Sequence, residues 1–110
     1  MFNPKPSTLT DLDAHQLHQA LMRNDVVLVD VREPDEHQAG RIAGAVNVPL
    51  SAFDPKALPQ AQGKTIVLHC AGGGRSARAL DICRRHGVDV RHHLSDGLNA
   101  WKAAGLPVIR

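Results

Sequence analysis

The sequence predicts an α/β fold in which helices cover both faces of a mainly parallel central sheet, a three-layer α/β/α arrangement. Two apolar runs rich in β-branched residues, 26–30 and 65–70, are typical of central strands that are buried on both faces. Segments with helical periodicity alternate with these runs along the chain. This alternation is the usual sign of parallel strands joined by crossover helices.

The N-terminal third is predicted to contain a lead-in, a helix and the first long strand. Residues 1–9 form a proline-rich lead-in that ends in a short edge strand at 7–9. Thr10 is the expected N-cap of a helix over 11–22, with Asp13 placed three residues later as in a capping box. The apolar face of this helix comprises Ala14, Leu17, Ala20 and Leu21.

The remaining elements follow from similar local patterns. A short strand at 45–48 ends before a proline, which cannot continue a strand ladder. Residues 50–63 are predicted to be a loop with at most one or two helical turns. A helix over 76–86, a strand over 88–94 and a helix over 98–104 complete the domain. In the helix over 76–86, we expect one face to carry Ala77, Leu80, and Cys83 or Arg84 on neighbouring turns.

Length and charge exclude several classes of protein. The 110 residues fit one domain, 1–110, and the formal net charge of +2 is spread along the chain. We therefore expect neither nucleic acid nor a membrane surface as a partner. The longest aliphatic run, 26–29, is far shorter than the ~20 residues of a membrane span, and the N-terminus has no apolar signal segment. These features indicate a soluble, cytoplasmic domain.

The cysteines and histidines do not indicate a metal site. The two cysteines, Cys70 and Cys83, are too few for a disulfide scaffold or a four-cysteine zinc site, and they are too far apart for a Cys-x-x-Cys pair. The histidine pairs 15/18 and 92/93 have no carboxylate at a spacing that would complete a site. We expect no metal, and we expect most of the seven histidines to face solvent.

A loop of small residues after the second long strand carries the candidate site. Cys70 ends that strand, and ligand sites of open α/β sheets lie at the carboxyl ends of the strands. Glycines let backbone N–H groups turn inward, and together with a helix N-terminus such groups stabilise negative charge. The Cys70 thiolate is therefore expected to be favoured. The loop and the start of the next helix comprise Ala71, Gly72, Gly73, Gly74, Arg75 and Ser76.

An inert, buried cysteine beside a turn is the alternative interpretation of this loop. Three successive glycines disfavour it, because each glycine costs conformational entropy on folding. Arg75 adds a permanent positive charge that either steers an anion into the loop or supports the loop.

Three blocks of sequence resemble the single-domain rhodaneses, a family of sulfurtransferases. Residues 30–49 are similar to the family's D-V-R followed by an acidic residue and by G-H-I-x-G-A-x-N-I-P. Residues 70–76 are similar to C-x-x-G-x-R-S, and residues 96–107 to G-G-x-x-A-W-x-x-x-G-x-P. Three departures affect local packing rather than the nucleophile, and they are His37 for an aromatic residue, Arg41 for histidine and Asp96 for glycine.

The resemblance implies a sulfurtransferase mechanism without metal or cofactor. Cys70 would attack the outer sulfur of thiosulfate or of a persulfide donor, and residues 71–76 would bind the anion. Cys70 would then hold the sulfur as a persulfide until an acceptor, such as cyanide, a thiol or a protein, removes it. The physiological donor and acceptor stay open.

The other candidate residues are expected to play supporting roles. Asp30 and Arg32, at the end of the first long strand, are expected to form a structural ion pair or to hydrogen-bond a loop. Ser76 is expected to cap its helix, with a role as a proton donor as the alternative. Strand alternation places the side chain of His69 on the face opposite Cys70, with a role as a catalytic base as the alternative. Cys83 is expected in the core, with a role as a resolving thiol as the alternative.

Two other functions are compatible with this type of fold. Related phosphatases and arsenate reductases have five residues between cysteine and arginine, whereas this chain has four, at 71–74. The shorter loop suits a single transferred sulfur. Non-catalytic rhodanese-like binding modules form the second alternative, but they typically lack the cysteine that this chain retains.

Overall fold

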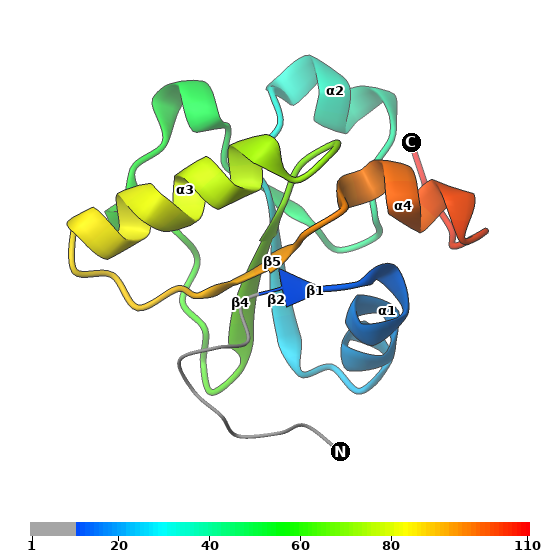
Figure 1. The fold of residues 1–110 in the computed structure, drawn as a ribbon, viewed down its shortest axis with the longest axis horizontal. Coiled ribbons are helices and arrows are strands. Elements are labelled where there is room, and N and C mark those ends of the chain that lie inside the picture. Colours follow the sequence, from blue (N-terminus) through cyan, green and yellow to red (C-terminus); the bar gives the residue numbers. More distant parts are fainter. Residues whose placement is uncertain (1–10) are drawn as a thin grey trace.

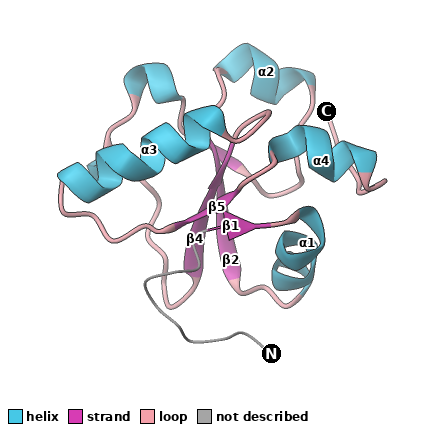
Figure 2. Ribbon diagram, in the orientation of Figure 1, coloured by secondary structure: helices cyan, strands magenta, loops and turns pink. Residues whose placement is uncertain are grey.

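The computed structural model describes residues 11–110, and it has a five-stranded, fully parallel sheet with strand order β1-β5-β4-β2-β3. Helices lie on both faces of this sheet (Figures 1 and 2), which confirms the predicted α/β class and its three layers. The strands are β1 (Asp11–Leu12), β2 (Val26–Asp30), β3 (Val46–Asn47), β4 (Thr65–His69) and β5 (His92–Leu94). The helices are α1 (Ala14–Met22), α2 (Pro34–Ala39), α3 (Gly74–Arg85) and α4 (Gly97–Ala103).

The two long strands form the centre of the sheet and separate two apolar clusters. β2 and β4 pair along their whole length, with Val29 opposite Leu68. These two side chains belong to the cluster on the α3 side, together with Ala79 and Cys83. The other cluster contains the neighbouring strand residues Leu28, Val67 and Leu94. α1 and α4 cover it with Leu17, Leu98 and Trp101. Alternation along the strands therefore decides which side chains reach α3.

The predicted start of the first helix is wrong. The helix begins at Ala14, and Asp13 is its N-cap, because the Asp13 carboxylate accepts the N–H of Gln16 at 2.8 Å and the Gln16 side chain accepts the N–H of Asp13 at 2.9 Å. Residues 11 and 12 form β1 instead and pair with β5. The strand predicted at 7–9 and the cap predicted at Thr10 lie outside the described residues.

Other element boundaries differ by a few residues. α3 begins at Gly74, two residues before the predicted start, and its buried face consists of Ser76, Ala79 and Cys83, while Ala77 is exposed. β5 covers only the last three residues of the predicted strand 88–94. The predicted helical turns within 50–63 are present as two short 3₁₀ turns.

The expectation for the histidines is also wrong. Among the seven histidines only His15 and His86 are exposed, whereas His69 and His93 are buried in the sheet region. Within residues 11–110, no helix combines the length and the apolar character needed to cross a membrane.

Candidate active site

The loop after β4 curls around the sulfur of Cys70. The backbone N–H of Gly73 donates a hydrogen bond to Cys70 Sγ at 3.1 Å, and that of Ser76 donates one at 3.4 Å. Ser76 lies in the first turn of α3, so the positive end of that helix also points toward the sulfur. Cys70 itself is almost completely buried, at 1% exposure. The loop therefore forms a cradle, residues 71–76, whose N–H donors favour a negative charge on the sulfur of Cys70.

The cradle changes the acidity of the two cysteines in opposite directions. Burial alone would raise the pKa of Cys70, but hydrogen bonds from Ser76, Gly73 and Gly72 outweigh it and lower that pKa below its ordinary value. Burial raises the pKa of Cys83, which lies inside the apolar cluster under α3. Cys70 is therefore the more acidic thiol, as the sequence predicted.

Two glycines allow the loop to pack against the start of α4. Gly73 has a φ of 103°, and a Cβ atom there would lie 1.9 Å from the carbonyl oxygen of Ser95. Gly97 has a φ of 69°, and its Cβ would lie 2.2 Å from the carbonyl oxygen of Ala71. Both positions combine a left-handed backbone with a close backbone approach, so only glycine fits them.

The first N–H groups of α4 hold the carbonyl side of the same loop. The N–H of Leu98 donates to the carbonyl of Cys70 at 2.8 Å, and the N–H of Asn99 donates to that of Ala71 at 3.0 Å. The loop is thus fixed from behind by α4 while its own N–H groups face the sulfur. This contact gives a physical reason for the third sequence block.

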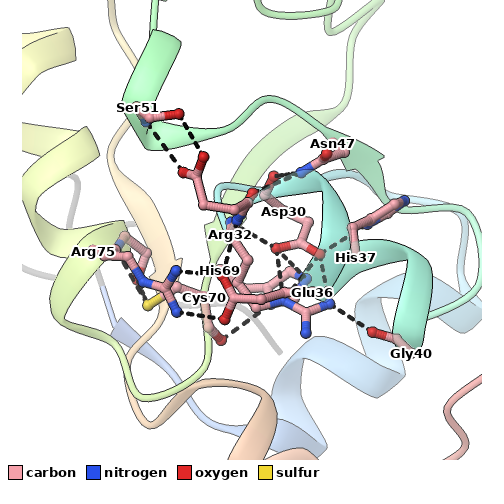
Figure 3. Close-up of polar contacts among 12 residues, drawn as sticks. Asp30, Arg32, Glu36, His37, Gly40, Asn47, Ser51, His69, Cys70 and Arg75 are labelled. Atoms are coloured by element: carbon pink, nitrogen blue, oxygen red, sulfur yellow. Dashed lines mark hydrogen bonds and ion pairs between the residues drawn. The ribbon is translucent and has the colours of Figure 1, made fainter.

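Arg75 is tied to α2 by an ion pair. Its Nη1 and Nη2 atoms lie 2.6 and 3.0 Å from the two carboxylate oxygens of Glu36 (Figure 3). The hydrogen bonds from Arg75 lower the pKa of Glu36. Of the two roles considered for Arg75, the contact favours support of the loop. Glu36 was not predicted as a site residue. Pro34 at the first helical position and the Glu33–Glu36 capping box are signals in the sequence for the helix that carries it.

Asp30 and Arg32 form a buried ion pair next to the site. Arg32 Nη2 lies 2.7 Å from Asp30 Oδ2, and the same nitrogen donates to the carbonyl of Gly40 at 2.7 Å. His37 Nδ1 lies 2.8 Å from Asp30 Oδ2, so the histidine that replaces an aromatic residue completes this cluster (Figure 3). The cluster holds the segment around α2 against the end of β2.

His69 lies on the Asp30 side of the sheet, as strand alternation predicted. Its Nε2 is 3.9 Å from Asp30 Oδ1, and its Nδ1 is 3.3 Å from the carbonyl oxygen of Cys70. Burial lowers the pKa of His69, which favours its neutral form. The imidazole therefore contacts the backbone of the cysteine and not the sulfur.

The predicted cap role of Ser76 is wrong, because Gly73 is the N-cap of α3. Ser76 is fully buried in the first turn, and its hydroxyl lies 3.7 Å from Cys70 Sγ and 2.8 Å from His93 Nδ1. His93 was not predicted from the sequence. The signal that could have found it is alternation along β5, since Leu94 faces the α1 and α4 side and its neighbour must face α3.

The described residues contain no group of three or more His, Cys, Asp or Glu side chains that could hold a metal ion. What surrounds the sulfur of Cys70 is a set of backbone N–H donors that lower the pKa of its thiol.

Comparisons with known proteins place this site in a family. The family model described as "Rhodanese-like domain" matches residues 13–104. An uncharacterized protein of Synechocystis is 48% identical over 94 residues, which are 86% of this chain and 52% of that protein, so the chain spans about half of that relative. A sulfurtransferase of Allochromatium vinosum is 29% identical, covering 92% of this chain and 95% of its own. A rhodanese-related protein of Thermoplasma volcanium superposes with a TM-score of 0.76 at 29% identity, covering 92% of this chain and 98% of that structure.

Proposed function

The chain belongs to the rhodanese-like domain family, and from this we propose that it is a sulfurtransferase in which Cys70 carries the transferred sulfur as a persulfide. The observation that carries the proposal is the pair of N–H donors on Cys70 Sγ, at 3.1 and 3.4 Å. They favour a thiolate at a position that is otherwise fully buried. The sulfurtransferase of Allochromatium vinosum, similar over nearly its whole length, supports the same assignment.

The proposed reaction has two steps. The Cys70 thiolate attacks the outer sulfur of thiosulfate, the bond between the two sulfur atoms breaks, and sulfite leaves with the electron pair of that bond. Cys70 is left with a terminal, negatively charged sulfur inside a loop that presents N–H groups. A nucleophilic acceptor then attacks this terminal sulfur and releases the thiolate. Cyanide serves as the acceptor in an assay, and a thiol or a protein acceptor would serve in a cell.

Loop size argues for sulfur as the transferred group. Residues 71–74 separate the cysteine from Arg75, and Arg75 is occupied by Glu36 at the rim. A phosphatase-type site needs room for a tetrahedral oxyanion and an arginine that faces it. The retained cysteine, with its lowered pKa, argues against a purely structural binding module.

The test is to follow the sulfur by mass. After incubation with thiosulfate, intact-mass measurement should show one added sulfur that disappears on addition of cyanide, with thiocyanate formed. Cys70→Ser should abolish this adduct, whereas the matched variant Cys83→Ser should retain it. Cyanide-labile sulfur on the Cys70→Ser protein would overturn the assignment of the nucleophile. Hydrolysis of an aryl phosphate without any thiocyanate would overturn the assignment of the reaction.

A further inference from the structure

A series of polar side chains in contact leads from the sulfur of Cys70 to the surface. The Ser76 hydroxyl lies 3.7 Å from Cys70 Sγ and 2.8 Å from Nδ1 of His93. On its other side, Nε2 of His93 lies 3.1 Å from Oδ1 of Asp11. His93 is only 7% exposed, whereas the Asp11 side chain is 67% exposed. The series of contacts thus extends from a buried thiol through a buried imidazole to an accessible carboxylate.

Three elements of the fold place these groups in line. β5 pairs with β4 so that His93 is opposite Leu68, whose side chain shares the α3 face with Cys70. β1 pairs with β5 so that Asp11 is opposite His93. α3 packs over β4 and β5 (Figure 1). Ser76, in the first turn of α3, therefore reaches His93 on this face. The arrangement is therefore fixed by strand register and helix packing, not by a local sequence motif.

The protons shared by these four side chains can be arranged in only a few ways that satisfy each donor and acceptor. The contact between Nε2 of His93 and the carboxylate of Asp11 requires a proton on Nε2. With neutral imidazole, Nδ1 has no proton and can accept the Ser76 hydroxyl proton at 2.8 Å, in competition with the carbonyl oxygen of Gly73 at 3.1 Å. The shorter contact favours the arrangement in which the hydroxyl points to Nδ1. The Ser76 oxygen can then only accept, and it is placed to accept the thiol proton of Cys70.

The protonated imidazole reverses these directions. Nδ1 now donates to the Ser76 oxygen, and the hydroxyl proton is free to point to the Cys70 thiolate or to the carbonyl oxygen of Gly73, which lies 3.1 Å away. In both arrangements Nε2 of His93 keeps its proton and donates it to the carboxylate of Asp11 at 3.1 Å. Among residues 11–110, the titratable groups linked to His93 by these contacts are Asp11 on β1 and, through Ser76, Cys70.

We propose that Cys70, Ser76, His93 and Asp11 form a proton path in which His93 receives, through the Ser76 hydroxyl, the proton that Cys70 loses. The S–H bond of Cys70 breaks as a new O–H bond forms on Ser76, and the former hydroxyl proton of Ser76 passes to Nδ1 of His93. The products are a thiolate and an imidazolium paired with Asp11, and no charge is created overall. His93 acts on the sulfur through Ser76 and is a positioning residue.

This inference rests on the proposed role of Cys70 as the nucleophile, but its test needs no sulfur donor. The rate of alkylation of Cys70 by iodoacetamide, followed on the Cys70 peptide by mass spectrometry across pH, reports the thiolate fraction. His93→Gln keeps a hydrogen-bonding side chain that cannot take a proton. It should raise the midpoint, the pH at which the alkylation rate of Cys70 reaches half its maximum, by about one pH unit. Below the midpoint, alkylation should therefore be about tenfold slower than in the wild type. Ser76→Ala should raise the midpoint as well, because the backbone N–H donors stay but the path is broken.

Two further variants control for damage to the fold. Asp11→Asn removes the carboxylate at the exposed end and should shift the midpoint in the same direction by a smaller amount. His92→Gln alters the neighbouring histidine of β5 and should leave the midpoint unchanged. If His93→Gln does not fold, the midpoint of alkylation in Asp11→Asn alone tests the proton path. A wild-type midpoint in both His93→Gln and Asp11→Asn, or an equal shift in His92→Gln, would overturn the path.

The two proposals fail separately. A wild-type protein that never acquires cyanide-labile sulfur, with alkylation midpoints that shift as described, would overturn sulfur transfer and leave the proton path in place. Unshifted midpoints in a protein that forms the persulfide would overturn the path alone.

Discussion

The carboxylate of Glu36 holds both terminal nitrogens of Arg75, at 2.6 and 3.0 Å, so the arginine of the cysteine loop is paired with α2. Both side chains are about one-third exposed, at 35%. The pair joins the first turn of α3, which supplies the Ser76 N–H donor to Cys70, to a helix that precedes it by almost forty residues in sequence. We infer that the cation steadies the cradle, while the N–H groups of Gly73 and Ser76 contact the sulfur.

Removal of Arg75 should therefore weaken catalysis by loosening the loop. Arg75→Ala should lower thiosulfate:cyanide turnover by about fivefold, the scale expected when an ion pair worth about 1 kcal/mol no longer orders the donors. The matched variant is Arg78→Ala, on the exposed part of the same helix, and its turnover should stay near that of the wild type. Equal effects of the two substitutions would contradict the supporting role.

Glu36→Gln separates support of the loop from direct binding of the substrate by Arg75. If the ion pair orders the loop, this variant should lose turnover about as much as Arg75→Ala does. If Arg75 instead bound the substrate anion, removal of the Glu36 charge would free the cation and raise the apparent affinity for thiosulfate. The KM for thiosulfate, measured for both variants, distinguishes the two roles.

Gly73 and Gly74 are adjacent, but they should respond very differently to alanine. At Gly73 the added Cβ would lie 1.9 Å from the Ser95 carbonyl oxygen, on a backbone with φ of 103°. At Gly74 no atom lies within 4 Å of the added Cβ. Gly73→Ala should lower the free energy of unfolding by about 2 kcal/mol or more and abolish the persulfide, whereas Gly74→Ala should stay within about 0.5 kcal/mol. Urea unfolding of both variants is the measurement, and similar midpoints would count against the described loop geometry.

The parts of the fold that local sequence determines were predictable. β2 and β4 are continuous apolar runs buried on both faces, and Cys70 follows directly on β4, so the strands and the position of the cradle could be inferred together. α4 also follows from its apolar residues and from the glycine after it. In each case the information lies within a dozen consecutive residues.

The parts that were missed depend on residues that are distant in sequence. α2 has only six residues and no buried side chain, so it has no apolar periodicity to detect. The polar contacts that hold it include the capping box, the ion pair with Arg75 and the contact between His37 and Asp30. The contact between Ser76 and His93 requires the register of β5 against β4. The sequence predicts an N-cap role for Ser76 because serine near the start of a helix usually occupies the N-cap position. Only the tertiary structure shows that its hydroxyl faces His93.

The buried Asp30 should make stability dependent on pH in the acid range. Burial alone would raise the pKa of Asp30, but the Arg32 guanidinium, His69 and His37 lower it below its ordinary value of 3.8. A carboxylate whose pKa is lower in the folded state contributes stability that is complete above the unfolded pKa and is lost as the pH falls toward the folded pKa. The free energy of unfolding of the wild type should therefore decrease below about pH 4 through this group.

Asp30→Asn tests the origin of this acid sensitivity. At pH 7 the variant should be less stable by about 3 kcal/mol, because Arg32, only 5% exposed, would be left as a buried charge without its carboxylate. The difference between variant and wild type should shrink as the pH falls below about 4, since protonation removes the same charge from the wild type. Asp35→Asn, at an exposed position of α2, is the matched control and should change the free energy by less than about 0.5 kcal/mol. Urea unfolding at several pH values between 7 and 3 measures both effects. A difference between wild type and Asp30→Asn that stayed constant down to pH 3 would mean that the ion pair with Arg32 is not what acid disrupts.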